Sequence, residues 1–229
     1  MRGYQRLTLI PIYVELARES YKILSQYEEI FRNVERSLAS LNIEEAAKLE
    51  LEWKLAALRH QVTKYAIVVV VFSALAVESY IYDYAARNLS DTFAKKYLDR
   101  LDLLSKWVIV PRLVTGREFP TGGQAFALLR KLVQRRNALV HNKTKPVPND
   151  PEQYLELVEK SQNAVTEMLL LAKEAIEALG QLAEVLENLD PEEFTSIIFG
   201  SPIGKNANSQ SYSFLDEFPE LRLRLDYTT

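Results

Sequence analysis

The side chains best suited to chemistry gather in one short stretch, residues 135–145, which reads RRNALVHNKTK. It combines guanidinium, amide, imidazole and ammonium groups, and Pro146 follows directly. Residues 119–149 contain no Asp or Glu but six basic residues, namely Arg130, Lys131, Arg135, Arg136, Lys143 and Lys145. The whole chain has a formal net charge of -3. A basic island in a slightly acidic chain favours a phosphate-bearing partner.

Helical geometry places three of these side chains close together. Asn137 and His141 are four residues apart, so they share one face of a helix, and Arg136 borders that face. Imidazole exchanges protons near neutral pH, as a general acid or base must. The planar fork of Arg136 fits phosphate oxygens, and Lys143 and Lys145 add point charges just beyond the expected helix end. The stretch therefore predicts a phosphate-handling site.

Composition excludes several other kinds of site. The chain has no cysteine, which rules out disulfides, thiolate nucleophiles and Cys-ligated metals and fits a reducing compartment. It has two histidines, and His60 lacks clustered partners, so we expect neither a metal site nor a cofactor. Glu15 and Glu19 interrupt the region where a secretory signal would be apolar. We therefore expect a cytoplasmic protein.

The most apolar run also argues against a membrane protein. It covers residues 66–77 and is stopped by Glu78, whereas a spanning helix needs about 20 apolar residues. Val68 to Val71 would favour a strand if taken alone. The flanks are rich in Ala and no turn residue bounds the run, so we predict a buried helix and no membrane contact.

The elements that must position the site are predicted to be helical. Neither Pro nor Gly occurs between Pro11 and Pro111, which favours an all-α fold with long N-terminal helices. A long amphipathic helix is expected to Leu41, and a second should begin near Ile43, with Asn42 as its N-cap. It either ends before Tyr65 or continues unbroken into the helix over residues 65–88.

The second half is expected to carry the site on one of several further helices. Ser90 should cap a helix to residue 106, followed by a loop over residues 107–123 and the basic helix from residue 124 to about His141. Asp150 and Pro151 start a helix to residue 189. Residues 150–193 hold twelve acidic residues against two lysines, which we interpret as a solvated face that balances the basic stretch.

The end of the chain is predicted to be less regular. A short helix should run from residue 191 to 199, and an irregular tail should follow, in which residues 221–225 alternate like a short edge strand. We therefore divide the chain into an N-terminal helical extension (1–62), a helical bundle (63–189), and a short helix with the tail (190–229).

The spacing in the basic stretch resembles a known signature. Arg136, four residues and then His141, with Asn137 directly after the Arg, is similar to the signature of the HEPN superfamily of helical nucleases and nucleotide-binding domains. The context agrees, because an Ala-rich helix around Glu78 and then residues 104–107 with a glycine-bearing loop precede it. The likeness is strongest to the RiboL-PSP-HEPN branch, and it covers roughly residues 65–179.

The resemblance implies a helical bundle that forms a homodimer with two signature helices facing each other. It implies a metal-independent endoribonuclease without a cofactor, in which His141 moves protons and Arg136 stabilises charge that builds on the phosphorane. Asn137 would orient the His or the phosphate, and Glu78 would hold the Arg in place. The residues expected to bind RNA are Arg130, Lys131, Arg135, Lys143 and Lys145.

Some members of the family pair with a nucleotidyltransferase antitoxin and carry a Tyr two residues after the His. Lys143 stands at that position here, which puts regulation by nucleotidylation of a tyrosine in doubt. A role in defence, in a toxin and antitoxin pair or in stress response therefore stays open, with an antitoxin or another protein as a partner. The alternative to a nuclease is a non-catalytic HEPN-like module that dimerises or binds nucleic acid or protein.

Overall fold

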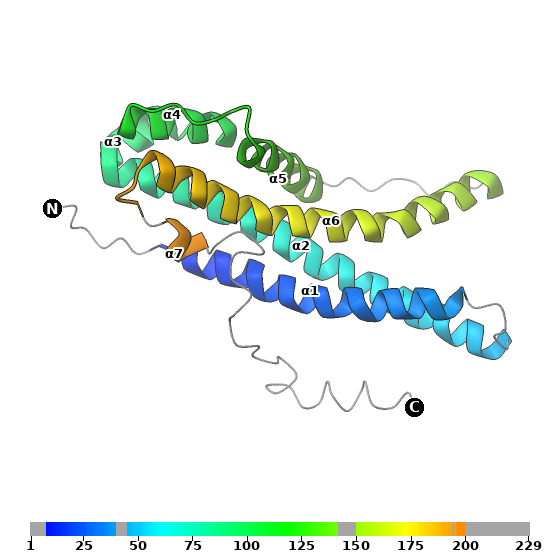
Figure 1. Cartoon of the computed structure of the whole chain (residues 1–229). Coiled ribbons are helices and arrows are strands. Elements are labelled where there is room, and N and C mark those ends of the chain that lie inside the picture. The colour runs from blue at the N-terminus through cyan, green and yellow to red at the C-terminus, as the bar shows by residue number, and fades with distance from the viewer. Residues whose placement is uncertain (1–7, 40–44, 142–149, 194, 200–229) are drawn as a thin grey trace.

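The computed structural model describes residues 8–39, 45–141, 150–193 and 195–199. The predicted all-α class is confirmed, because the described residues contain helices and no strand (Figure 1). The predicted edge strand at residues 221–225 lies outside the described residues. In chain order the elements are α1 (Ile10–Leu38), α2 (Glu45–Leu89), α3 (Asp91–Phe93), the π-helix η1 (Ala94–Leu98), α4 (Leu103–Thr115), α5 (Gln124–Val140), α6 (Pro151–Leu189) and α7 (Thr195–Phe199).

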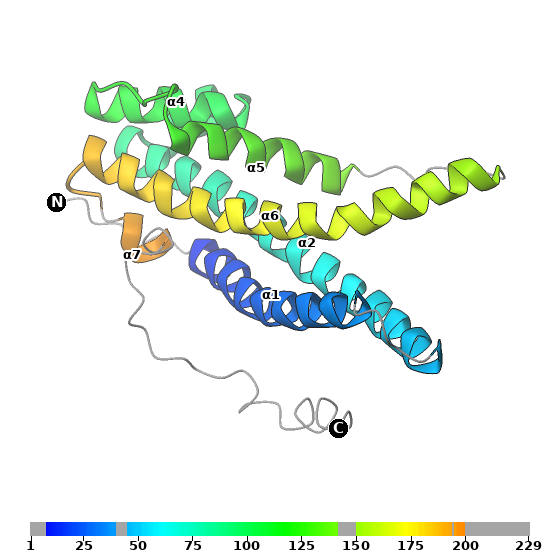
Figure 2. The same cartoon turned by 45° about the vertical axis from the view of Figure 1, so that its right-hand side comes forward.

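Helix α2 is the central element of the fold. It runs unbroken through the valine run at residues 68–71, so the helix predicted there is confirmed. It also crosses the boundary between residues 62 and 63 at which the sequence suggested dividing the chain. Helix α1 packs along one side of α2, and α6 lies along another side (Figures 1 and 2). Val69, Ala74 and Val77 of α2 are fully buried in the shared core.

Helix α2 also contains a window that is long and apolar enough to cross a membrane. Over 18 residues its mean hydropathy is 1.8, and 50% of that window is buried inside the protein. The central helix of a helical bundle gives the same signal, because its sides are covered by neighbouring helices. Length and composition alone are therefore weak evidence for a membrane span here.

Helix α4 corrects the prediction for residues 107–123. The sequence predicted one helix from Ser90 to residue 106 and a loop after it. The structure instead interrupts the helix at residues 99–102, and α4 runs from Leu103 to Thr115 with Pro111 inside it. Asp102 caps its start by accepting a hydrogen bond from the Ser105 N–H at 3.0 Å. Gly116 ends it in the left-handed conformation (φ 74°) that favours glycine. The prediction for residues 107–115 was wrong because burial of the helix face outweighs the missing N–H of one proline.

The predicted start of α6 is confirmed. Pro151 is the first residue of the helix, and the side chain of Asp150 accepts a hydrogen bond from the Glu152 N–H at 2.8 Å. The helix ends at Leu189, as the apolar spacing predicted. Its acidic residues therefore lie on one continuous helix that packs against α2 and α5.

A buried polar cluster ties the end of the described chain to α2. The Tyr80 hydroxyl donates to Glu193 at 2.5 Å, and the Tyr84 hydroxyl donates to Asp190 at 2.7 Å. Arg87 donates to both carboxylate oxygens of Glu193, at 2.8 and 3.0 Å. Burial opposes its charge, but hydrogen bonds to Glu193 and Asp83 raise the pKa of Arg87 above its ordinary value. These bonds fix the turn that leads into α7.

Candidate functional site

The candidate residues lie on the last two turns of α5. The first part of this helix is anchored by buried side chains that recur at helical spacing, namely Ala125, Phe126, Leu128, Leu129 and Leu132. After Leu132 no residue of α5 is buried. The sequence thus builds a helix that is fixed in the core at its start and presents its C-terminal end to solvent.

Arg136 is held by a carboxylate from the central helix. Its Nη2 donates to Oε2 of Glu78 at 2.6 Å, and the Arg136 and Glu78 side chains are 24% and 41% exposed. The Nε of Arg136 is buried and has no partner within the described residues. The structure therefore brings together the two residues that the sequence linked across 58 positions. The ion pair fixes the direction of the guanidinium and neutralises part of its charge.

Asn137 and His141 are exposed one turn apart at the helix end. The His141 N–H donates to the Asn137 carbonyl at 3.0 Å, so His141 is the C-cap residue of α5. Neither side chain forms a hydrogen bond or ion pair with the described part of the chain. Both are therefore accessible to a ligand, beside the fixed Arg136. Lys143 and Lys145, which the sequence placed next to them, lie outside the described residues.

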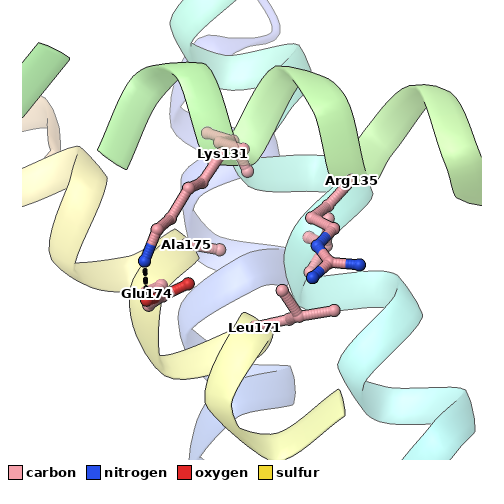
Figure 3. A pocket seen from close by; sticks show the side chains of 7 residues that line it. Lys131, Arg135, Leu171, Glu174 and Ala175 are labelled. Atoms are coloured by element: carbon pink, nitrogen blue, oxygen red, sulfur yellow. Dashed lines mark hydrogen bonds and ion pairs between the residues drawn. The ribbon is translucent and has the colours of Figure 1, made fainter. Parts of the chain in front are cut away.

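The other predicted RNA-binding residues are engaged by neighbouring side chains. Lys131 donates to Glu174 of α6 at 2.5 Å, as Figure 3 shows, and Arg135 pairs with Glu167 at 2.8 Å. The guanidinium of Arg130 lies over the ring of Phe126, 5.3 Å from its centroid. The acidic face of α6 thus neutralises the basic face of α5 in part. The side chains of Lys131 and Arg135 are each about half exposed, so a phosphate can still compete with the two carboxylates for these cations.

One feature near the site was not found from the sequence. A groove of about 460 Å³ lies beside Glu78, between the start of α1, α2 and α4. Lys106 lines it although the residue is only 7% exposed, and it has no ion pair within the described residues. Ser79 and Tyr82 add hydroxyl groups to the same wall. The burial of Lys106 could not be predicted from the sequence, where it is one lysine beside an apolar run, because this burial depends on how α4 packs on α2.

The described residues hold no group of three or more His, Cys, Asp or Glu that could bind a metal ion.

No family model, curated protein or solved structure matches the chain. What the site can do must therefore be judged from its own geometry. It offers a positioned guanidinium, an exposed amide and an exposed imidazole within six residues of one helix, which is a set that can bind a phosphate and move a proton.

Proposed function

We propose that this chain is a HEPN-type endoribonuclease that cuts RNA without a metal, at a site assembled from two copies of α5. The observation that carries the proposal is the ion pair between Glu78 and Arg136 at 2.6 Å. It holds one nitrogen of the guanidinium, so the fork stays positioned while its Nη1 has no partner within the described residues. Asn137 and His141 stand exposed beside it.

The proposed reaction is attack of a ribose 2′-oxygen on the adjacent phosphorus. An imidazole takes the 2′-OH proton, the new bond to phosphorus forms a 2′,3′-cyclic phosphate, and the bond to the 5′-oxygen breaks. The leaving 5′-oxygen takes a proton from a second acid. Arg136 stabilises the negative charge that builds on the non-bridging oxygens of the phosphorane, and Asn137 orients the phosphate or the imidazole.

This chemistry favours a site made of two copies. The attacking and leaving oxygens lie on opposite sides of the phosphorus, so one imidazole cannot act on both at once. Each copy offers a single histidine at the end of α5, His141, and a homodimer supplies two. Val140 next to it is 56% exposed, which gives the end of α5 an apolar contact for a second copy.

A second candidate function is a non-catalytic module that dimerises or binds nucleic acid or protein. The observation that favours it is the pairing of three cations of α5 with carboxylates of the same chain, Glu78, Glu167 and Glu174. An arginine that is half-buried in an ion pair can serve the fold alone. Such a module would bind RNA in a salt-sensitive way without cutting it.

The two functions are separated by the products formed from RNA in excess chelator. We expect single-stranded or structured RNA to yield fragments with 2′,3′-cyclic phosphate and 5′-hydroxyl ends. A matched RNA with 2′-O-methyl groups should bind but stay intact, because it lacks the attacking hydroxyl. Intact RNA in every sample, or equal cleavage of the methylated strand, would reject the proposed reaction.

A further inference from the structure

The N-terminal half of α2 has two apolar sides. One side is buried against α1, and its core residues Leu55, Leu58 and Val62 are each at most 8% exposed. Tyr65 continues this side and stacks on Tyr27 of α1, with 5.7 Å between ring centroids. These contacts use one side of the segment, so the packing of α1 on α2 does not explain an apolar face on its other side.

The opposite side of α2 carries a second stripe, here named the outer seam, which is mainly apolar and includes the polar residues His60 and Thr63. Its members are separated alternately by four and three residues, and they are Leu49, Trp53, Ala56, His60, Thr63 and Ile67. This is the spacing with which one helix packs along another in a coiled coil. Trp53 is 71% exposed, Leu49 is 56% exposed and Ile67 is 37% exposed. A tryptophan this exposed is the kind of residue that dominates protein interfaces.

The outer seam continues into the core of the molecule. The same spacing leads from Ile67 to Val70, Ala74 and Val77, which are buried. Val70 lines a small cavity together with Leu132 of α5 and Leu171 of α6. Towards its N-terminal end, α2 diverges from the first half of α6 in both views (Figures 1 and 2). The outer seam is thus a core-facing stripe that loses its covering helix.

The charges beside the outer seam are divided by sign along the helix. Glu45, Glu50 and Glu52 precede Trp53, with Lys48 as the one basic residue among them. Arg59 and Lys64 follow it, and no Asp or Glu occurs from residue 53 to 77. The carboxylates of Glu45, Glu50 and Glu52 form no ion pair within the described part of the chain. A helix divided in this way is complementary to a second copy of itself in the antiparallel direction.

We propose that the outer seam is a self-association surface that binds the outer seam of a second copy in antiparallel orientation. Trp53 then packs on Ala56 and Ala57 of the second copy, where small residues leave room for a large ring. The same register brings Glu52 close to Arg59 of the second copy. A parallel pair would instead set acidic residues against acidic residues. The contact lies on α2 and does not depend on the proposed RNA cleavage at α5.

The first test measures the self-association of the full chain by sedimentation velocity over a concentration series. We expect Trp53→Ala and Leu49→Ala each to weaken association by about tenfold or more, because each removes apolar area from the seam. Leu170→Ala is the matched control, since Leu170 is 55% exposed on α6 and lies outside the outer seam. It should associate like the wild type. Association that is absent in the wild type, or equal in Trp53→Ala, would overturn the proposal.

The second test uses charge reversal and needs no loss of apolar area. Glu52→Lys alone and Arg59→Glu alone should each weaken association, because like charges then face each other. The double variant restores opposite charges across the contact and should recover association. Circular dichroism confirms that each variant is folded. If the double variant is no better than the single ones, the antiparallel pairing is wrong.

The third test measures the relative direction of the two α2 helices in the pair. Because the chain has no cysteine, a spin label attaches only at a cysteine that is introduced for the purpose. Spin labels on Lys64→Cys should lie about 30 Å apart in the antiparallel pair, since each copy places residue 64 about 14 Å from the centre at 1.5 Å per residue. A parallel pair would hold them roughly 10 Å apart, about one interhelical distance. The short distance would contradict the proposal even if the chain associates.

Discussion

Arg135 and Arg136 are neighbours on α5 with different surroundings. Arg136 is 24% exposed and held by Glu78, whereas Arg135 is 46% exposed and pairs with Glu167 on the surface. A surface pair of this kind contributes little to stability, so Arg135 is available to a phosphate backbone. Arg136 has the fixed direction that charge stabilisation in a transition state requires.

Replacing each of the two arginines should therefore impair a different step, RNA binding for Arg135 and cleavage for Arg136. We expect Arg135→Ala to weaken RNA binding a few-fold, roughly the effect of one phosphate contact, and to leave the single-turnover cleavage rate nearly unchanged. Arg136→Ala should lower that rate by about 100-fold or more. Binding is followed by fluorescence anisotropy and cleavage by single-turnover kinetics. Equal losses of rate in the two variants would show that the assignment of roles is wrong.

Tyr80 makes the stability of the fold sensitive to alkaline pH. Burial, with the nearby Glu193 carboxylate, raises the pKa of Tyr80 above its ordinary value. The folded chain therefore holds this proton more tightly than the unfolded chain, whose tyrosines titrate near about pH 10. The stabilisation is complete below that pH and is lost as pH rises further.

The matching test compares wild type with Tyr80→Phe in denaturant titrations at several pH values. The variant should lose about 1–3 kcal/mol at neutral pH, because Glu193 and Thr195 lose a buried hydrogen-bond partner. Between about pH 9 and 11 the free energy of unfolding should fall more steeply for the wild type than for the variant. Parallel curves would mean that other groups control the alkaline response.

Residue-level prediction from the sequence was limited by partners that are far away along the chain. The link between Glu78 and Arg136 was proposed only because the basic stretch resembles a family signature. The partners of Lys131 and Arg135 lie 43 and 32 residues away, on α6, and nothing in local spacing identifies them. The sequence predicted that the acidic segment balances the basic one, but which carboxylate meets which cation depends on how α5 crosses α6.

At the scale of elements, α4 shows how end residues set the limits of a helix. Asp102 accepts from the Ser105 N–H at 3.0 Å and from the Ser105 hydroxyl at 2.5 Å, and Gly116 closes the other end. The hydrogen bonds from Ser105 lower the pKa of Asp102. Between these ends, Trp107 and Val110 are buried and hold the helix through Pro111.

We expect Asp102→Ala to lower the free energy of unfolding by about 1 kcal/mol, as is usual for the loss of an N-cap. Asp102→Asn, which keeps an acceptor, should lose less. Because the carboxylate has a lowered pKa, its contribution is present above about pH 4 and is lost as pH falls through the folded-state value. Urea titrations at pH 7 and pH 3 measure this. A loss that is equal at both pH values would contradict the capping account.

Prediction of the elements succeeded where one periodicity dominates and failed where packing decides. The long runs without Pro or Gly predicted α1 and the helical character of residues 45–89, although they left open whether α2 is one helix or two. The Asp150 and Pro151 pair predicted the start of α6. Pro111 and Gly116 suggested a loop, but only the glycine ends α4. A proline inside a helix costs about 3 kcal/mol, so the local sequence predicts a break at Pro111. Buried contacts elsewhere on the helix can offset this cost.

At the scale of the whole molecule, each proposed site needs a second copy. The end of α5 presents one Arg136 and one His141, and the reaction asks for two imidazoles. If the two copies share one cleft, a pair of one wild-type and one His141→Ala chain holds a single imidazole and should be nearly inactive. We expect an excess of His141→Ala, equilibrated with the wild type, to lower the cleavage rate per wild-type chain. That rate should stay unchanged if each chain acts by itself.

The central claim is that Arg136 and His141 form a metal-independent ribonuclease site, and cleavage of RNA in excess chelator tests it most directly. The wild type should cut, and the matched control Arg112→Ala, which removes an exposed arginine of α4, should cut at the same rate. Arg136→Ala and His141→Ala should be slower by about 100-fold or more. Intact RNA with the wild type, or equal cutting by His141→Ala, would contradict the account.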